Sequence, residues 1–214
     1  IIYGFNKCSE AGSDPFAISI FLAGCNMYCP YCLNAKLIQR HHSGQPNVDG
    51  LTAVSFKTIE GYIREHGVKC TVISGGEPTL TDTQLLENLI DELRVIPSKV
   101  GLSTNGTSPE VLVRILPKLD FVAIDVKTAN DDAYRRLYGT YPAYHPLTAV
   151  MTSLALIRME KAKRSSFDYE VRTTLYRIMI DIDAIGKNII KPSDRWVLQQ
   201  YRRPSHKENN NGQA

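Results

Sequence analysis

Six short apolar runs recur along this chain of 214 residues, and segments with a helical pattern lie between them. The runs are rich in β-branched and aromatic residues and stop at glycine or polar residues, as buried strands do. Strands that alternate with helices form a parallel sheet through right-handed crossovers. The pattern therefore predicts a single α/β domain over residues 1–203, with strands at 16–23, 69–74, 100–103, 121–124, 169–175 and 196–199.

The number of these units indicates an incomplete barrel. A closed barrel takes eight units and about 250 residues, whereas six units here occupy about 190 residues. This predicts a partial (β/α)6 barrel, with a short strand and loop in residues 1–15 and a polar, disordered tail over 204–214. Helices are expected over 51–66, 131–138, 147–163 and 180–190, from a capping box at Thr81–Gln84 to about Val95, and from Ser108-Pro109 onward.

Three cysteines fall within eight residues, directly after the strand at 16–23. Their spacing is C-x3-C-x2-C, and thiolates so spaced on one loop can converge on a soft metal centre. A structural zinc site would need a fourth ligand, for which His41 and His42 are candidates. An iron–sulfur cube usually takes four thiolates, so three would leave one iron open to bind another molecule. The spacing predicts a metal centre at Cys25, Cys29 and Cys32, with zinc and iron–sulfur both open.

Polar or glycine-rich groups stand at the ends of four expected strands. Because the carboxyl ends of parallel strands meet at one edge of a sheet, we expect these groups to lie beside the cysteines. The glycines would let backbone approach a ligand closely, and Glu77 could accept hydrogen bonds from a cationic amine. Without a ligand, the same residues form a tight turn and a strand-end ion pair. The groups are Gly75-Gly76-Glu77-Pro78, Ser103-Thr104-Asn105-Gly106, Asp125-Val126-Lys127 and Arg172, with weaker candidates at Gln199, Gln200 and Arg202.

The cysteine segment, with Pro30 and Tyr31 before its last cysteine, resembles the signature of the radical S-adenosylmethionine (radical SAM) enzymes. The resemblance implies the fold of that family, a partial barrel. It also implies a [4Fe–4S] cluster on Cys25, Cys29 and Cys32, whose fourth iron chelates the amine and carboxylate of S-adenosylmethionine (SAM). Reductive cleavage of SAM would then yield a 5′-deoxyadenosyl radical that abstracts hydrogen.

Further motifs extend the resemblance to the SAM site. Gly75-Gly76-Glu77 resembles the family's GGE motif, which binds the SAM amino group, and Pro78 continues the likeness. Ser103-Thr104-Asn105-Gly106 and Asp125-Val126-Lys127 resemble the D-T-N-G and D-x-K motifs of the activases. By this resemblance Thr104 and Lys127 would reach the carboxylate or ribose of SAM.

The same resemblance implies positions for other residues. Asp125 would help to fix the site, in some relatives through a monovalent cation, and Ser103 departs from the more usual aspartate. Tyr31 would pack by the adenine, and Asn34 would lie just beyond the cluster. Arg172 would face SAM or the substrate.

The order of the motifs over residues 16–202 resembles that in the activating proteins of anaerobic ribonucleoside-triphosphate reductase. These are glycyl-radical-enzyme activases, so the resemblance implies a glycyl radical enzyme as partner and flavodoxin or ferredoxin as electron donor. Two alternatives stay open. One is a small-molecule radical SAM enzyme such as a 7-carboxy-7-deazaguanine synthase-like protein, and the other is a zinc-binding interaction module.

Composition excludes several other classes. A net charge of +3 gives no electrostatic footprint for nucleic acid, and no apolar run reaches the length of a transmembrane helix. The five cysteines are odd in number and three are clustered, which does not resemble a disulfide framework. Cys8 and Cys70 stand alone. These features favour a reducing, cytoplasmic setting, with neither a membrane nor a nucleic acid as partner.

Overall fold

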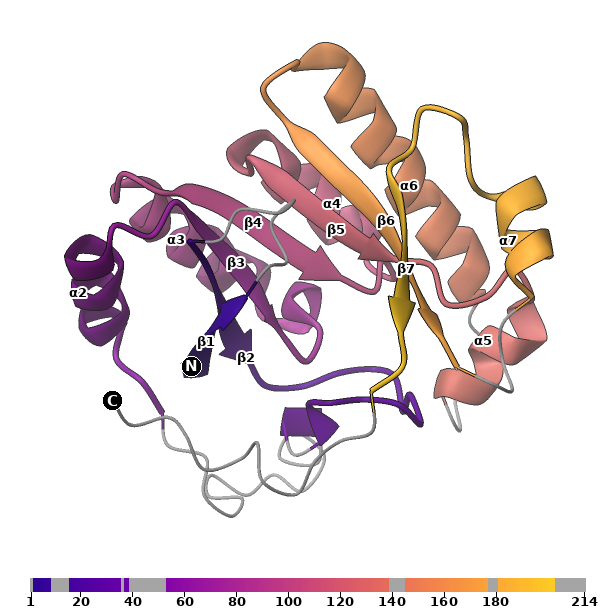
Figure 1. Cartoon of the computed structure of the whole chain (residues 1–214), viewed down its shortest axis with the longest axis horizontal. Coiled ribbons are helices and arrows are strands. Elements are labelled where there is room, and N and C mark those ends of the chain that lie inside the picture. Colours follow the sequence, from indigo (N-terminus) through magenta and orange to yellow (C-terminus); the bar gives the residue numbers. More distant parts are fainter. Residues whose placement is uncertain are drawn as a thin grey trace.

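The computed structural model describes residues 2–8, 16–35, 37–38, 53–138, 145–176 and 181–202. Its centre is a seven-stranded sheet whose strands follow one another in sequence order (Figure 1). Strands β2 to β7 are parallel, which confirms the predicted partial barrel. The strands are β1 (Ile2–Cys8), β2 (Ala17–Leu22), β3 (Cys70–Gly75), β4 (Lys99–Thr104), β5 (Phe121–Asp125), β6 (Asp168–Leu175) and β7 (Trp196–Gln200).

Strand β1 extends this sheet at one edge and runs antiparallel to β2, with Ile2 opposite Leu22. The same Ile2 also forms an isolated bridge with Val54. That bridge changes the start of the next helix, which begins at Phe56 and not at residue 51. Ser55 caps the helix, because its side chain accepts a hydrogen bond from the backbone N–H of Thr58.

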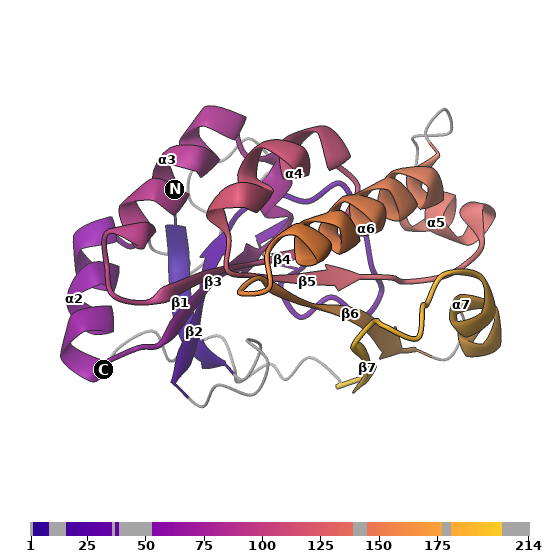
Figure 2. The same ribbon diagram turned by 90° about the horizontal axis from the view of Figure 1, so that it is seen from above.

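Helices cover one face of the sheet, and Figures 1 and 2 show α3, α4 and α6 on the same side of it. Alternate strand residues point toward this layer and are buried, among them Ile18 and Ile20 of β2 and Val100 and Leu102 of β4. The helices are α2 (Phe56–His66), α3 (Thr83–Arg94), α4 (Pro109–Ile115), α5 (Asp131–Tyr138), α6 (Pro146–Lys163) and α7 (Ile182–Asn188), with two 3₁₀ turns, η1 (Pro78–Leu80) and η2 (Leu116–Lys118).

The capping box predicted for α3 is wrong by one residue. Asp82 caps the helix, because its carboxylate accepts from the backbone N–H of Leu85 at 3.0 Å. Thr81 closes the preceding turn instead, and its N–H donates to the carbonyl of Pro78 at 3.0 Å. At α4, Pro109 occupies the first turn as expected, but the Ser108 side chain makes no capping hydrogen bond.

The segment that follows β2 carries the three clustered cysteines and runs across toward β7, at the other edge of the sheet (Figure 1). It is fixed on the way by the N–H of Tyr28, which donates to the carbonyl of Leu137 in α5 at 2.6 Å. Among the residues that the structure describes, no helix combines the length and the apolar character needed to cross a membrane.

Candidate functional site

A cavity of about 500 Å³ lies where the carboxyl ends of the strands face the cysteine segment. It brings together the candidates from the motifs except Gly106, Val126 and Pro78, the last of which is buried at the start of η1. The groups at the strand ends therefore lie beside the cysteine segment, and their contacts with a ligand stay a prediction. The candidates that line the cavity are Cys25, Cys29, Tyr31, Cys32, Asn34, Gly75, Gly76, Glu77, Ser103, Thr104, Asn105, Asp125, Lys127 and Arg172.

Other lining residues lie outside the motifs. The weaker candidates Gln199, Gln200 and Arg202 line the cavity, and so do six residues that the motifs do not single out. Thr174 could have been predicted, because residues two apart in a strand lie on the same face and Arg172 lines the cavity. No local pattern marks most of the others. The six are Met27, Leu33, Ile38, Ser74, Thr174 and Tyr201.

The three thiols of the cysteine segment are partly buried and carry raised pKa values. Burial raises the pKa of Cys25 to about 12, and the nearby Glu77 carboxylate contributes in the same direction. Burial also raises the pKa of Cys29 and of Cys32. The thiols are therefore protonated in the free protein, and a metal centre must displace those protons when it binds.

The donor set fits an iron–sulfur cluster. Three soft sulfur ligands line one cavity, and thiolates are the usual ligands of such clusters. Among the described residues, no group of three Cys, His, Asp or Glu side chains is arranged to hold a single metal ion. A cube does not require such convergence, because each thiolate binds a different iron. His41 and His42, the candidate fourth zinc ligands, lie outside the described residues.

The Gly75-Gly76 pair lets two stretches of backbone meet. The N–H of Gly76 donates to the carbonyl of Leu22 at 2.8 Å, and the N–H of Glu77 donates to the carbonyl of Gly24 at 2.6 Å. A Cβ on Gly76 would lie 1.8 Å from the Gly24 oxygen, and one on Gly75, whose φ is +112°, would lie 2.4 Å from the Leu22 oxygen. These close contacts show that both positions need glycine because backbone packs against backbone there. The sequence alone predicts instead that the glycines let backbone approach a ligand.

Glu77 is 1% exposed, and its carboxylate ties β3 to β4. Its Oε1 accepts from the N–H and Oγ1 of Thr79 and from Oγ1 of Thr104, at 3.1, 2.7 and 2.7 Å. Its Oε2 accepts from the N–H of Asn105 at 2.6 Å. Burial raises the pKa of the carboxyl although these bonds oppose the shift. Glu77 lines the cavity, and Oε2, which accepts one hydrogen bond within the described residues, has capacity for a further donor.

Lys127 supplies a cation at the end of β5. Its Nζ lies 2.8 Å from Oδ2 of Asp125 and 5.9 Å from the centre of the Tyr31 ring. Burial acts to lower the pKa of Lys127, but the negative charge of Asp125 and its hydrogen bond, together with Cys29 and Tyr31, outweigh burial and hold the pKa well above its ordinary value. Tyr31 also packs against Tyr176, with ring centres 5.2 Å apart. The cavity thus combines a fixed positive charge with an aromatic wall.

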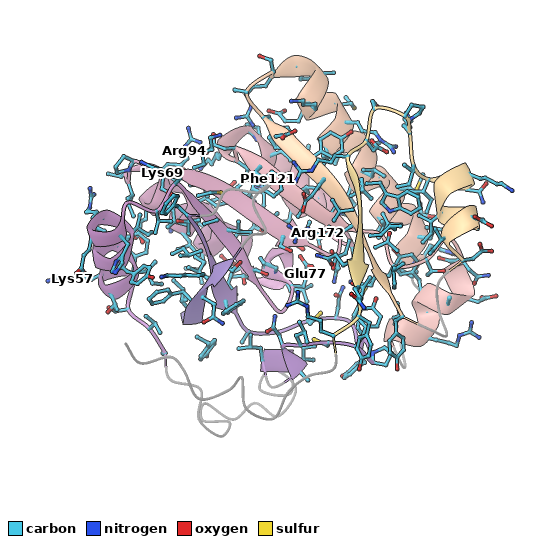
Figure 3. All side chains as sticks on the ribbon, viewed as in Figure 1. Lys57, Lys69, Glu77, Arg94, Phe121 and Arg172 are labelled. Atoms are coloured by element: carbon cyan, nitrogen blue, oxygen red, sulfur yellow. The ribbon has the colours of Figure 1, made fainter. Side chains whose placement is uncertain are left out.

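Arg172 is 3% exposed and reaches the cavity from β6. Its Nε donates to Oε1 of Glu170 at 2.5 Å, and Arg195 pairs with the other oxygen of that buried carboxylate. Figure 3 places Glu77 and Arg172 near the middle of the molecule, where the strands face the cysteine segment. Two guanidinium groups thus share one buried carboxylate in this wall.

Two more predicted residues make contacts within the protein. The side-chain Nδ2 of Asn34 donates to the carbonyl of Gly75 at 2.9 Å, so it fastens the cysteine segment to β3. The side chain of Asn105 bonds to Asn26 and Thr107. Ser103 lines the cavity from β4, between β3 and β5.

A family model described as the radical SAM superfamily matches residues 19–176 of this chain. The chain belongs to this superfamily. Members of the radical SAM superfamily use a [4Fe–4S] cluster and SAM, which favours the iron–sulfur interpretation of the cysteines over zinc. The matched range includes the cysteine segment and all of the motifs at the ends of β3 to β6.

Relatives include activating enzymes of glycyl radical enzymes. The chain is 30% identical over 187 residues to a Methanocaldococcus jannaschii protein provisionally named a glycyl-radical enzyme activating enzyme, covering 85% of this chain and 71% of that one. It is 26% identical over 141 residues to the Escherichia coli pyruvate formate-lyase 1-activating enzyme, covering 64% and 56%. A 7-carboxy-7-deazaguanine synthase of Clostridium acetobutylicum is 34% identical over 111 residues, covering 50% and 46%.

Solved structures share the fold. TYW1 with a lysine–pyruvate adduct bound matches with a TM-score of 0.59 and 17% identity, covering 92% of this chain and 70% of that chain. Archaeal TYW1 matches with a TM-score of 0.50 and 18% identity, covering 85% and 65%. At these identities the likeness concerns the fold alone.

Proposed function

We propose that this radical SAM enzyme is an activase, which cleaves SAM reductively and generates a glycyl radical on a partner enzyme. The proposal is carried by the similarity to the archaeal activating-enzyme relative over 85% of the chain. The similarity to the pyruvate formate-lyase activating enzyme supports the same class. The order of the motifs favours a partner like anaerobic ribonucleotide reductase, with flavodoxin or ferredoxin as the electron donor.

The cavity offers a group for each part of SAM. Cys25, Cys29 and Cys32 would hold the [4Fe–4S] cluster, which when bound supplies the electron for SAM cleavage. Glu77 would accept a hydrogen bond from the SAM amino group through Oε2. Lys127 stays protonated beside Asp125 and would attract the SAM carboxylate. The Tyr31 ring offers a flat surface for the adenine.

The rim of the cavity suits a macromolecular hydrogen donor. Leu33 lines the cavity and is 58% exposed, and Tyr28 on the same segment is 51% exposed. Exposed apolar side chains beside a reaction cavity are typical of a surface that another protein covers. A glycine loop of the partner would cover this rim and exclude water from the radical.

Anaerobic reconstitution tests the proposal. The loaded protein is incubated with SAM and dithionite, and 5′-deoxyadenosine is measured with and without a candidate glycyl radical enzyme. A glycyl doublet in the electron paramagnetic resonance (EPR) spectrum of the partner is the expected result. Release of 5′-deoxyadenosine without any doublet, across a panel of such partners, would contradict the activase assignment and leave the family assignment intact.

A matched pair of cysteine variants links this activity to the segment. Cys25→Ala removes a thiol that lines the cavity, whereas Cys70→Ala changes a buried thiol that packs with Ala17 and Val72. We expect the first variant to lose iron and SAM cleavage and the second to keep both. Equal iron content in the two variants would exclude Cys25 as a ligand.

The second candidate is a small-molecule radical SAM enzyme. It is favoured by the identity of 30–34% to three 7-carboxy-7-deazaguanine synthases, although each match covers only about half of this chain. Such an enzyme would consume a heterocyclic substrate in the absence of a protein partner. Turnover of the synthase substrate by the cluster-loaded protein, without a protein partner, would support the small-molecule function and argue against the activase function.

A further inference from the structure

A closed ring of hydrogen bonds joins the cysteine segment to the loop after β4. Nδ2 of Asn26 donates to Oγ1 of Thr107 at 2.9 Å, and Oδ1 of Asn26 accepts from Nδ2 of Asn105 at 2.9 Å. Thr107 in turn donates to Oδ1 of Asn105 at 2.6 Å. Asn26 directly follows the first clustered cysteine, and its two partners lie about 80 residues further along the chain.

The ring allows only one orientation of its side chains. The backbone N–H of Thr107 donates to Oδ1 of Asn105 at 3.1 Å, so flipping the Asn105 amide would set its NH₂ group against that N–H. The Thr107 hydroxyl donates to the same oxygen and therefore accepts from Asn26. Rotating the Asn26 amide by half a turn would set its NH₂ group against the NH₂ group of Asn105. Asn105 and Thr107 are buried, so these bonds are not exchanged with water. The ring therefore holds Asn26 in one position.

Cys25 lies between two such anchors. On its N-terminal side, the carbonyl of Gly24 accepts from the N–H of Glu77 at 2.6 Å. On its C-terminal side, Asn26 is held by the ring. With both neighbours fixed, the backbone turns so that the N–H of Met27 donates to the Sγ atom of Cys25 at 3.4 Å. The anchors thus determine a hydrogen bond to a ligand sulfur.

We propose that Asn26, together with Asn105 and Thr107, positions the cysteine segment so that the Met27 N–H is held against the Cys25 sulfur and tunes the reduction potential of the cluster. Hydrogen bonds to ligand sulfurs are among the factors that set the potential of an iron–sulfur cluster. Such a bond stabilises the more electron-rich, reduced form, so it raises the potential.

The inference concerns the cluster and is independent of which molecule loses its hydrogen. It assigns Asn26 a positioning function that the cysteine spacing does not indicate. It also assigns the Asn105 side chain a structural role within the protein. The motif resemblance suggests that this side chain contacts the cofactor instead. Its failure would leave the proposed activase function untouched, because the readouts below require no partner enzyme.

The test compares two variants with two matched controls. Asn26→Ala removes one member of the ring, and Thr107→Val replaces the hydroxyl by a methyl group of similar size. The controls are Asn88→Ala on α3 and Thr152→Val on α6, which make the same chemical changes at exposed positions outside the cavity. If Asn26→Ala does not fold, Thr107→Val alone tests whether the ring positions the Met27 N–H.

Two readouts are measured on each protein. Hydrogen exchange of the cluster-free protein follows the Met27 amide, and an EPR-monitored titration of the loaded protein gives the midpoint potential. We expect faster exchange at Met27 and a more negative midpoint in both ring variants, with iron content and exchange elsewhere unchanged. The controls should match the wild type.

Wild-type exchange at Met27 in both ring variants would overturn the positioning function. Faster exchange with an unchanged midpoint potential would overturn the tuning of the cluster. A merely structural ring would lower the stability of the fold without moving the midpoint, so the potential separates the two explanations.

Discussion

Replacing Gly76 with alanine places a methyl group where the backbone of Gly24 already lies. The new Cβ would be 1.8 Å from the Gly24 oxygen. An ordinary contact between carbon and oxygen needs about 3.3 Å, so the two chains would have to separate by about 1.5 Å. Neighbours that are backbone atoms cannot move aside as a flexible side chain can. The end of β2 would therefore have to leave the end of β3.

The cost follows from the bonds that this separation breaks. The N–H of Glu77 would lose the Gly24 carbonyl, and the N–H of Gly76 would lose the Leu22 carbonyl. Each unsatisfied buried group costs about 1–3 kcal/mol, which makes about 2–6 kcal/mol for the pair. Domains of this size unfold at about 5–15 kcal/mol, so the loss is large. We expect a marked fall in the unfolding midpoint of the cluster-free protein in urea.

Gly61→Ala is the matched control. Gly61 lies inside α2, and a Cβ there would have nothing within 4 Å. Alanine in a helix is more favourable than glycine by about 0.8–1.0 kcal/mol, so this variant should be slightly more stable than the wild type. If Gly76→Ala stays within about 0.5 kcal/mol of the wild type while SAM affinity falls, the glycine serves ligand approach and the backbone argument is refuted.

Three further predictions follow from the charges and thiols. Arg158 pairs with Asp194, whose side chain is buried, and helps to hold the pKa of that carboxyl below its ordinary value, although burial opposes the shift. Asp194→Asn should therefore cost about 3–5 kcal/mol in urea unfolding at pH 7. Because the folded pKa is lowered, the stability from this pair is present above about pH 4 and is lost as pH falls through the folded pKa, so the variant should show a smaller loss in acid than the wild type. Cys25, with a pKa of about 12, should react with iodoacetamide at pH 8 far more slowly than a free thiol, as mass spectrometry of the cluster-free protein can show; equal rates would contradict the burial argument. Lys127→Met should keep its iron and weaken SAM binding about ten- to a hundred-fold, the value of a charge-assisted bond of about 1.5–3 kcal/mol, and unchanged SAM affinity would remove Lys127 from the site.

Much of the fold follows from local patterns. The six parallel strands and the cavity at their carboxyl ends could be predicted because strand runs, their polar ends and the crossover rule are all readable along the chain. The direction of β1 could not be predicted, because the sequence of a short strand does not indicate whether it pairs in parallel or antiparallel with its neighbour. The start of α2 could not be predicted either, because Val54 forms a bridge with Ile2, a residue far away in the sequence.

The site divides in a similar way. Residues next to a recognisable motif, such as Tyr31 and Asn34, could be expected near the site from their position, and both line the cavity. The ring of Asn26, Asn105 and Thr107 was not, because its members are polar residues of ordinary type that meet only when distant parts of the chain fold together. Three-dimensional partners of this kind leave no periodic signal in a single sequence.

The sequential strand order has a consequence for the timing of assembly. Each strand pairs with the one before it, so the sheet can grow in the direction of synthesis. The cysteine segment emerges early, yet its cavity wall includes Gln199 and Gln200 of β7. At about 5–20 residues per second, roughly 8 to 34 s separate the synthesis of Cys32 from that of Gln200. During this interval the three thiols lack part of their surroundings, so we expect the cluster to be inserted after β7 has been synthesised.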